Sequence, residues 1–388
     1  DTQRPSDLLS NSKAPPPPSL REHLRSRPIS FRLFRMKLSA LLSVVCCAVG
    51  LFLALSAAHV ESARHTLHAP ETMFVFGDSF VDNGNLPRSD LAAESRQWYY
   101  PYGISYHKDD GSGRRQNATG RFSDFMVQSD FVAKMLGLPQ SPPAFSSAQK
   151  RYCHPTGVNF AFGRAAVYHS PEVMITVGEQ VDLFESMVKS GTISKNRVTH
   201  SVALLAISGN DYKTYYDAGI LDLTPVIEGL GNQTVAIVDR LRALGVKRIL
   251  VNNLHPIGCT PLWSRASKYK ECDYIGNNAA LQHNKILKQK LGRKKGVLIV
   301  DLNTAFGNII DHGSKSYKQF KNTRKPCCEG YRANNYCGRQ AKNYPPLYSL
   351  CPDRSQFFFW DDAHPTHAGW ETVMKQLERP IKKFLGIV

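Results

Sequence analysis

Short apolar runs alternate with longer segments of helical periodicity, and this alternation constrains the fold more than any other feature of the chain. The runs cover residues 73–76, 202–207, 248–252 and 297–301, with 158–161 as a further candidate. Residues 223–244 and 277–291 place apolar side chains at helical spacing, and a last helix is expected from Thr366 or His367 to Phe384. Strands separated by helices are typical of a parallel sheet covered on both faces. Such sheets place their functional sites at the carboxyl ends of the strands.

Three further segments lack this alternation. Residues 98–157 and 312–356 are expected to be irregular insertions over the sheet. Residues 1–35 carry four consecutive prolines and few large apolar side chains, so we expect a disordered leader or a non-native extension. Residues 64–388 are expected to form a single domain.

The segment from Met36 to Ala63 has the layout of a secretory signal peptide. Met36-Lys37 gives a positive start, an apolar run follows, and small residues close it. We therefore expect secretion, with no stable membrane anchor after cleavage. The run is also about long enough to span a bilayer, so a retained anchor stays open as the alternative.

Basic residues outnumber acidic ones, 49 to 32, which gives a formal net charge of +17. They are dispersed along the chain, and no aromatic-interleaved nucleic-acid motif accompanies them. We therefore expect no nucleic-acid partner, and an acidic matrix or wall polymer as a possible contact.

The cysteines fit an exported protein. Four of them crowd residues 326–352, but no CxxC pair occurs, so disulfides are favoured over a zinc site. Seven cysteines follow the signal segment, and an odd number leaves at least one thiol free or paired outside the chain: Cys153, Cys259, Cys272, Cys327, Cys328, Cys337 and Cys351. Asn117 and Asn232 lie in acceptor sequons for N-glycosylation.

The strand at 73–76 stops at Gly77, which leaves Asp78 and Ser79 in a turn. Ser79 is either a small polar residue that caps the next helix or a nucleophile. A serine hydroxyl becomes a nucleophile only when a base removes its proton and a third group orients that base.

Among the 13 histidines, His364 has the setting of such a base. An aromatic run ends in Asp361, and His364 follows three residues later. In one turn this spacing can bring the Asp361 carboxylate to one ring nitrogen and leave the other free to accept the serine proton. The alternative is that Asp361 only caps the helix after Pro365.

A serine nucleophile that attacks a carbonyl group also needs donors directed at the oxyanion that forms. Residues 158–163 end in Gly163, whose backbone N–H is a candidate, and residues 207–211 contain Asn210, whose side-chain amide is a second. The Ser79 N–H would be the third. Ser-Gly-Asn-Asp is also an ordinary turn sequence.

Together these motifs resemble the plant-type GDSL esterases and lipases of the SGNH hydrolase superfamily, from residue 72 to the end of the chain. The resemblance rests on Phe76-Gly77-Asp78-Ser79 with Asp82 and Gly84-Asn85, on residues 119–124, 157–161, 209–212 and 256–261, on Cys327-Cys328, and on Phe359-Trp360-Asp361 to His364-Pro365-Thr366.

The resemblance implies a three-layer α/β/α sandwich around a parallel sheet of about five strands. It also implies a secreted serine esterase that hydrolyses carboxylic esters through an acyl-enzyme on Ser79. His364 would be the base, Asp361 its orienting partner, and Gly163 and Asn210 would complete the oxyanion hole. No metal and no cofactor is implied. The substrate would be a lipid or an acylated wall component.

Three residues depart from the family pattern. Phe80 replaces the usual leucine, Arg164 stands where another glycine is usual, and Asp362 adds a second carboxylate beside the base. Arg164 either turns to solvent or reaches the mouth of the site. Two alternatives to the main reading stay open, a polysaccharide O-acetylesterase and a catalytically silent wall-binding or storage protein of the same fold.

Overall fold

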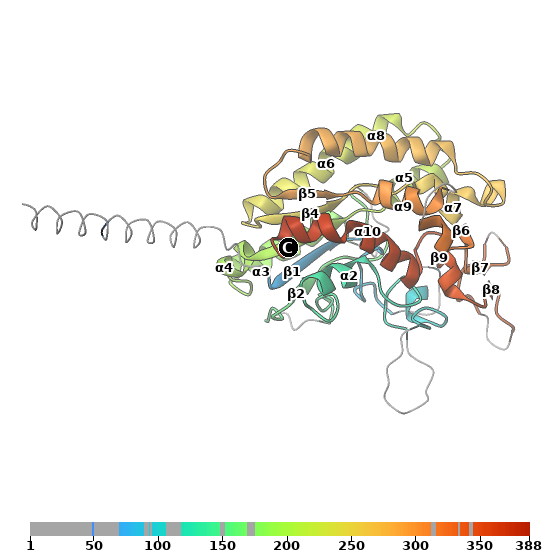
Figure 1. Ribbon diagram of the computed structural model, residues 1–388, viewed down its shortest axis with the longest axis horizontal. Coiled ribbons are helices and arrows are strands. Elements are labelled where there is room, and N and C mark those ends of the chain that lie inside the picture. Colours follow the sequence, from blue (N-terminus) through green and yellow to red (C-terminus); the bar gives the residue numbers. More distant parts are fainter. Residues whose placement is uncertain are drawn as a thin grey trace, which may run out of the picture. The chain divides into compact units, whose positions relative to one another are not determined.

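Five parallel strands form the central sheet of the protein, described here from a computed structural model (Figure 1). In the sheet they lie in the order β2-β1-β3-β4-β5. Their bounds are Thr72–Gly77 for β1, Gly157–Asn159 for β2, Ser201–Ala206 for β3, Arg248–Asn252 for β4 and Val297–Val300 for β5. All five expected strand segments are confirmed, although β2 is shorter and starts one residue earlier than predicted.

The structure describes Val49 and residues 70–88, 93, 95–105, 118–147, 152–168, 175–311, 316–332, 334–340 and 344–388. His68–Val388 form one compact unit. The predicted leader, almost all of the predicted signal peptide and the sequon residue Asn117 lie outside the described residues. No helix in the described part of the chain has the length and apolar character needed to cross a membrane.

Helices cover both faces of the sheet. The helices of one face are α3 (Val177–Lys189), α6 (Thr224–Ala243) and α8 (Tyr274–Leu291). Those of the other are α2 (Gln128–Met135), α9 (Leu302–Ile310) and α10 (His367–Leu385). In Figure 1 α6 and α8 run side by side, and α10 crosses the sheet as the last, red helix. The expected three-layer α/β/α architecture is confirmed.

The remaining elements are short. Three helical segments follow strand or helix ends: α4 (Lys195–Thr199), α5 (Asn210–Asp217) and α7 (Pro261–Ser264). Two small sheets lie outside the main one, formed by β6 (Asn322–Pro326) with β9 (Phe357–Phe359), and by β7 (Cys328–Gly330) with β8 (Tyr348–Leu350).

The prediction of irregular structure over residues 98–157 and 312–356 is therefore partly wrong. The first segment contains α2, and the second contains β6, β7 and β8. Helix α2 escapes a periodicity search because three of its five buried residues are polar, beginning with Gln128 and Ser129. The strands escape it because a run of three to five residues is too short to show an alternation.

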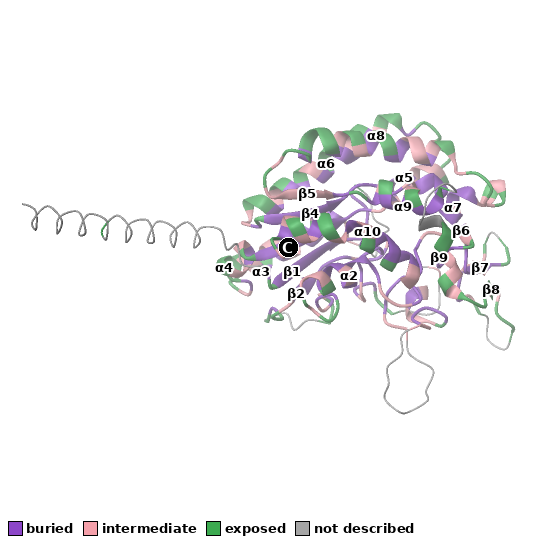
Figure 2. Cartoon of the chain, viewed as in Figure 1, coloured by how far each residue is buried: buried purple, intermediate pink, exposed green. Residues whose placement is uncertain are grey.

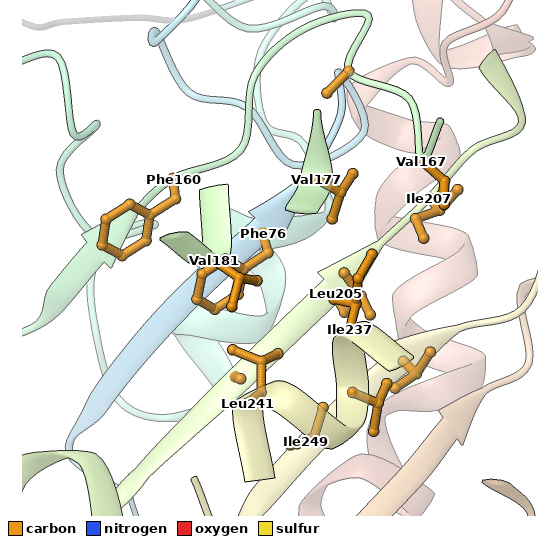
Figure 3. Close-up of a cluster of buried hydrophobic side chains, with 14 of the residues drawn as sticks. Phe76, Phe160, Val167, Val177, Val181, Leu205, Ile207, Ile237, Leu241 and Ile249 are labelled. Atoms are coloured by element: carbon orange, nitrogen blue, oxygen red, sulfur yellow. The ribbon is translucent and has the colours of Figure 1, made fainter. Parts of the chain in front are cut away.

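Two apolar cores, one on each face of the sheet, hold the layers together. Every residue of β1 and β3 is buried, as expected for strands covered on both sides. Figure 2 shows the strands as the buried centre, with exposed residues on the outer sides of α6 and α8. In Figure 3 the side chains of Phe76, Leu205 and Ile249 project from neighbouring strands toward Val181, Ile237 and Leu241 on the helices. This packing fixes the strand ends on which the site is built.

Three disulfides confirm the prediction from the cysteines. They join Cys259 to Cys272, Cys327 to Cys351 and Cys328 to Cys337. Cys153 is a free, buried thiol.

Candidate active site

Ser79 follows the carboxyl end of β1, and the sequence around it fixes that end closely. Gly77 has φ +138°, and a Cβ there would lie 1.9 Å from the carbonyl oxygen of Ala206 on β3. Only glycine allows this approach of the two strands. The buried Gln180 side chain of α3 accepts from the Gly77 N–H and donates to the Gly77 carbonyl, both at 2.8 Å. Ser79 is thereby presented on a rigid turn, with 5% of its surface exposed.

His364 reaches Ser79 from the loop after β9. Its Nε2 lies 2.8 Å from Ser79 Oγ, and its Nδ1 lies 2.7 Å from Asp361 Oδ1. The same carboxylate oxygen accepts the backbone N–H groups of Ala363 and His364 at 3.0 and 2.9 Å. The loop is thus folded around Asp361, and the structure brings together the three residues that the sequence predicted as a triad.

Two further residues hold Asp361, and the sequence did not reveal them. Arg96 Nη2 donates to Asp361 Oδ2 at 3.1 Å and to Asp362 Oδ1 at 2.6 Å. The hydroxyl of Tyr102 donates to Asp361 Oδ2 at 2.7 Å. Burial acts to raise the pKa of Asp361, but the neighbouring His364 and Arg96 outweigh it and lower that pKa below its usual value. Asp361 therefore stays ionised next to the base.

Aromatic packing holds the ring of His364. Phe122 stacks on it with ring centroids 4.8 Å apart, and the Arg96 guanidinium lies 5.8 Å from the Phe122 centroid. Gly163 makes room for this arrangement, because a Cβ there would lie 2.8 Å from Phe122 Cε2.

The predicted role of Gly163 as an oxyanion donor is contradicted. Its N–H donates to the buried Asp82 carboxylate at 2.7 Å. That carboxylate also accepts three N–H groups from residues 84–86, so it organises the loop after Ser79. The Gly163 N–H is therefore part of the loop scaffold and is not available to a substrate.

Asn210 lies at the start of α5 and faces the same cavity as Ser79 and His364. Its Nδ2 donates to the Ala165 carbonyl at 2.9 Å and lies 3.4 Å from Asp78 Oδ2. A side-chain amide carries two hydrogens, so one donor is used by Ala165 and the other has only this long contact. The Ser79 N–H has no hydrogen-bond partner among the described residues.

The Asp78 side chain connects the turn that carries Ser79 with the loop that precedes Asn210. Its carboxylate accepts the backbone N–H of Ser208 at 2.6 Å and that of Phe80 at 3.1 Å. Burial raises the pKa of Asp78 to about 6. The side chain thus links the turn of Ser79 to the loop that carries Asn210.

Comparison with known proteins identifies the type of site. Residues 73–377 match the family model described as GDSL-like lipase/acylhydrolase. The chain belongs to this family. Two relatives from Arabidopsis thaliana are the GDSL esterase/lipase At5g03610, 30% identical over 89% of this chain and 97% of its own length, and the GDSL esterase/lipase At5g03600, 34% identical over 81% and 95%. The chain is thus a carboxylic ester hydrolase of the GDSL type.

Among solved structures, one match is a catalytic mutant of the acetylxylan esterase Axe2 from Geobacillus stearothermophilus. It covers 82% of this chain and 95% of its own, with 16% identity and a TM-score of 0.38. Such a remote likeness says nothing about the substrate of this GDSL enzyme.

The three departures from the GDSL pattern all lie at the site. Arg164 has φ +65°, a conformation that favours glycine, and it lines the cavity beside Ser79 rather than turning away from it. Asp362 lines the same cavity and pairs with Arg96. Phe80 packs between His255 and Trp370, with ring centroids 4.9 and 5.1 Å away.

One group of possible metal ligands occurs in the described part of the chain, formed by Asp361, Asp362 and His364. The Arg96 guanidinium already bonds both carboxylates, and His364 Nε2 is directed at Ser79. A cation would have to compete with Arg96 for the same oxygens, so this group fits an acid–base site better than a metal site.

Proposed function

We propose that this GDSL enzyme hydrolyses carboxylic esters through an acyl-enzyme on Ser79. Ser79 Oγ attacks the carbonyl carbon while His364 Nε2 takes the hydroxyl proton. His364 then gives this proton to the leaving alcohol, which departs and leaves the acyl group on Ser79. Water then attacks the acyl-enzyme while His364 takes its proton, and His364 returns this proton to Ser79 Oγ as the acid is released. The observation that carries the proposal is the continuous hydrogen-bonded chain Ser79–His364–Asp361, at 2.8 and 2.7 Å.

In this mechanism Asp361 orients His364 and stabilises the imidazolium that forms. The Ser79 N–H and the Asn210 amide bind the oxyanion, because both border the cavity at the nucleophile. The Asn210 hydrogen that makes the long 3.4 Å contact with Asp78 is the one that the oxyanion takes over. Gly163 supports them indirectly, through its hydrogen bond to Asp82.

We further propose that the enzyme is secreted. The three disulfides support export, since such bonds persist in oxidising compartments. Asn232 of its second sequon is exposed on α6, where a glycan would meet no buried surface. Contact with an acidic wall polymer remains a prediction from the net charge.

The test is the Ser79→Ala variant, assayed on a short-chain p-nitrophenyl ester beside the wild type. We expect kcat to fall by at least about 1,000-fold with an unchanged unfolding temperature, because a nucleophile is lost and no packing changes. A folded wild type without turnover would favour the catalytically silent alternative, and a variant with wild-type turnover would exclude Ser79 as nucleophile.

A further inference from the structure

Two cavities meet at the proposed site, and they differ in size. The larger one, of about 340 Å³, contains Ser79 and His364. The smaller one, of about 40 Å³, contains neither. Asn210 borders both, so a substrate carbonyl between Ser79 and Asn210 would stand at their junction.

The chemistry assigns one side of the ester to each cavity. His364 must protonate the leaving alcohol, so the alcohol has to lie in the cavity that His364 lines. That is the larger cavity. The acyl group is the other substituent of the same carbonyl carbon, and the smaller cavity offers it a separate space beside Asn210.

Apolar side chains form much of the wall of the smaller cavity, which Ser208, Lys213 and Thr260 also line. Phe80, Ile257 and Trp263 contribute side chains that are at most 7% exposed. His255 lines it too, and burial lowers the pKa of His255 to about 3, so the ring is uncharged. Phe80 and His255 rest on the aromatic core at Phe306, 6.3 and 5.0 Å away between ring centroids. This wall cannot move back without disturbing the core.

We propose that the smaller cavity is the acyl subsite and that it limits the enzyme to short acyl groups on a larger alcohol. The free space of about 40 Å³ is only about three times the 10–15 Å³ that one water needs, so it accepts a short acyl chain beyond the carbonyl carbon. Phe80 sets this limit, because it stands on the inner wall where the family pattern has the smaller leucine. This inference rests on the proposed acyl-enzyme mechanism.

The test is a series of p-nitrophenyl esters, acetate to hexanoate, with a constant alcohol. For the wild type, kcat/KM should fall at least about tenfold from acetate to hexanoate, since an acyl chain that does not fit loses its binding. Phe80→Leu should reduce this ratio at least about fivefold. The matched control is Phe184→Leu, which removes the same volume from the core on the other face, away from the cavity, and should leave the ratio unchanged.

Equal kcat/KM values of the wild type for hexanoate and acetate would overturn the subsite but leave the mechanism intact. An equal change of the acetate-to-hexanoate ratio in Phe80→Leu and Phe184→Leu would do the same. If Phe80→Leu does not fold, the wild type is labelled with fluorophosphonates that carry a methyl or a hexyl group on phosphorus. Faster labelling by the methyl reagent is expected, and equal rates overturn the proposal. A folded wild type that neither cleaves any ester nor takes any label refutes the proposed function itself.

Discussion

The two sides of the site are built in different ways. The nucleophile side stands on the main sheet, where Gly77 touches β3 and Gln180 holds both of its backbone groups. The acid–base side stands on a strand of three residues, β9, and depends on side chains from a distant part of the chain. Main-chain packing thus positions Ser79, whereas hydrogen bonds to one carboxylate position His364. We expect mutations to affect the two sides differently.

On the acid–base side the largest effect is expected for His364→Ala, which removes the base. Without a base at 2.8 Å from Ser79 Oγ, kcat should fall by about 100- to 10,000-fold. The free energy of unfolding should stay close to the wild-type value, because the main sheet does not depend on His364. Steady-state kinetics and urea unfolding measure the two quantities. Retention of more than a tenth of the turnover would show that another group is the base.

Arg96→Met tests whether the guanidinium holds the acid–base side together. Asp361, 1% exposed, would be left beside Asp362 without its cation, which should cost about 3 kcal/mol of unfolding free energy and lower kcat. Arg240→Met is the matched control. Arg240 also pairs with two carboxylates, Asp182 and Glu185, but its side chain is 38% exposed, so its loss should cost under about 1 kcal/mol. An equal loss of unfolding free energy in Arg96→Met and Arg240→Met would contradict the role of Arg96 in holding the acid–base side together.

Asp78→Asn tests the nucleophile side through pH. The pKa of Asp78 is raised from 3.8 to about 6, so its protonated form stabilises the fold below about pH 4 and this contribution is lost as pH rises through about 6. The shift corresponds to about 3 kcal/mol. The asparagine variant does not titrate, so its stability relative to wild type should improve from pH 4 to pH 7.5. Urea unfolding at several pH values measures this, and a constant difference would contradict it.

Tyr102→Phe should give the smallest effect, again on the acid–base side. The variant removes one donor from Asp361 but keeps the ring and the Arg96 contact. A hydrogen bond to a charged group contributes about 1.5 kcal/mol, so we expect a loss of that order and a kcat reduced by less than the Arg96 variant shows. The kinetics of Tyr102→Phe, Arg96→Met and the double variant would show whether Tyr102 and Arg96 act on the same carboxylate, that of Asp361. Strictly additive effects would count against this.

The difference between the nucleophile side and the acid–base side also explains what could be predicted from the sequence. The strands and the residues Ser79, Asp361 and His364 were found because short apolar runs and a three-residue spacing are local signals. Arg96 and Tyr102 were missed because they contact Asp361 across 265 and 259 residues, from a segment without periodicity. The only sign of Arg96 in the sequence was Asp362, because a second carboxylate beside Asp361 needs a cation as partner. For Gly163 the sequence located the loop but not the direction of its N–H, which depends on the buried Asp82.

The most direct test of the central claim is covalent labelling of the intact protein by a fluorophosphonate, followed by peptide mapping. The reagent reacts with a serine only where a base activates it, as His364 would activate Ser79. We predict one modified residue, Ser79, and loss of labelling in His364→Ala. Labelling at another serine, or undiminished labelling of Ser79 without His364, would contradict the proposed catalytic triad.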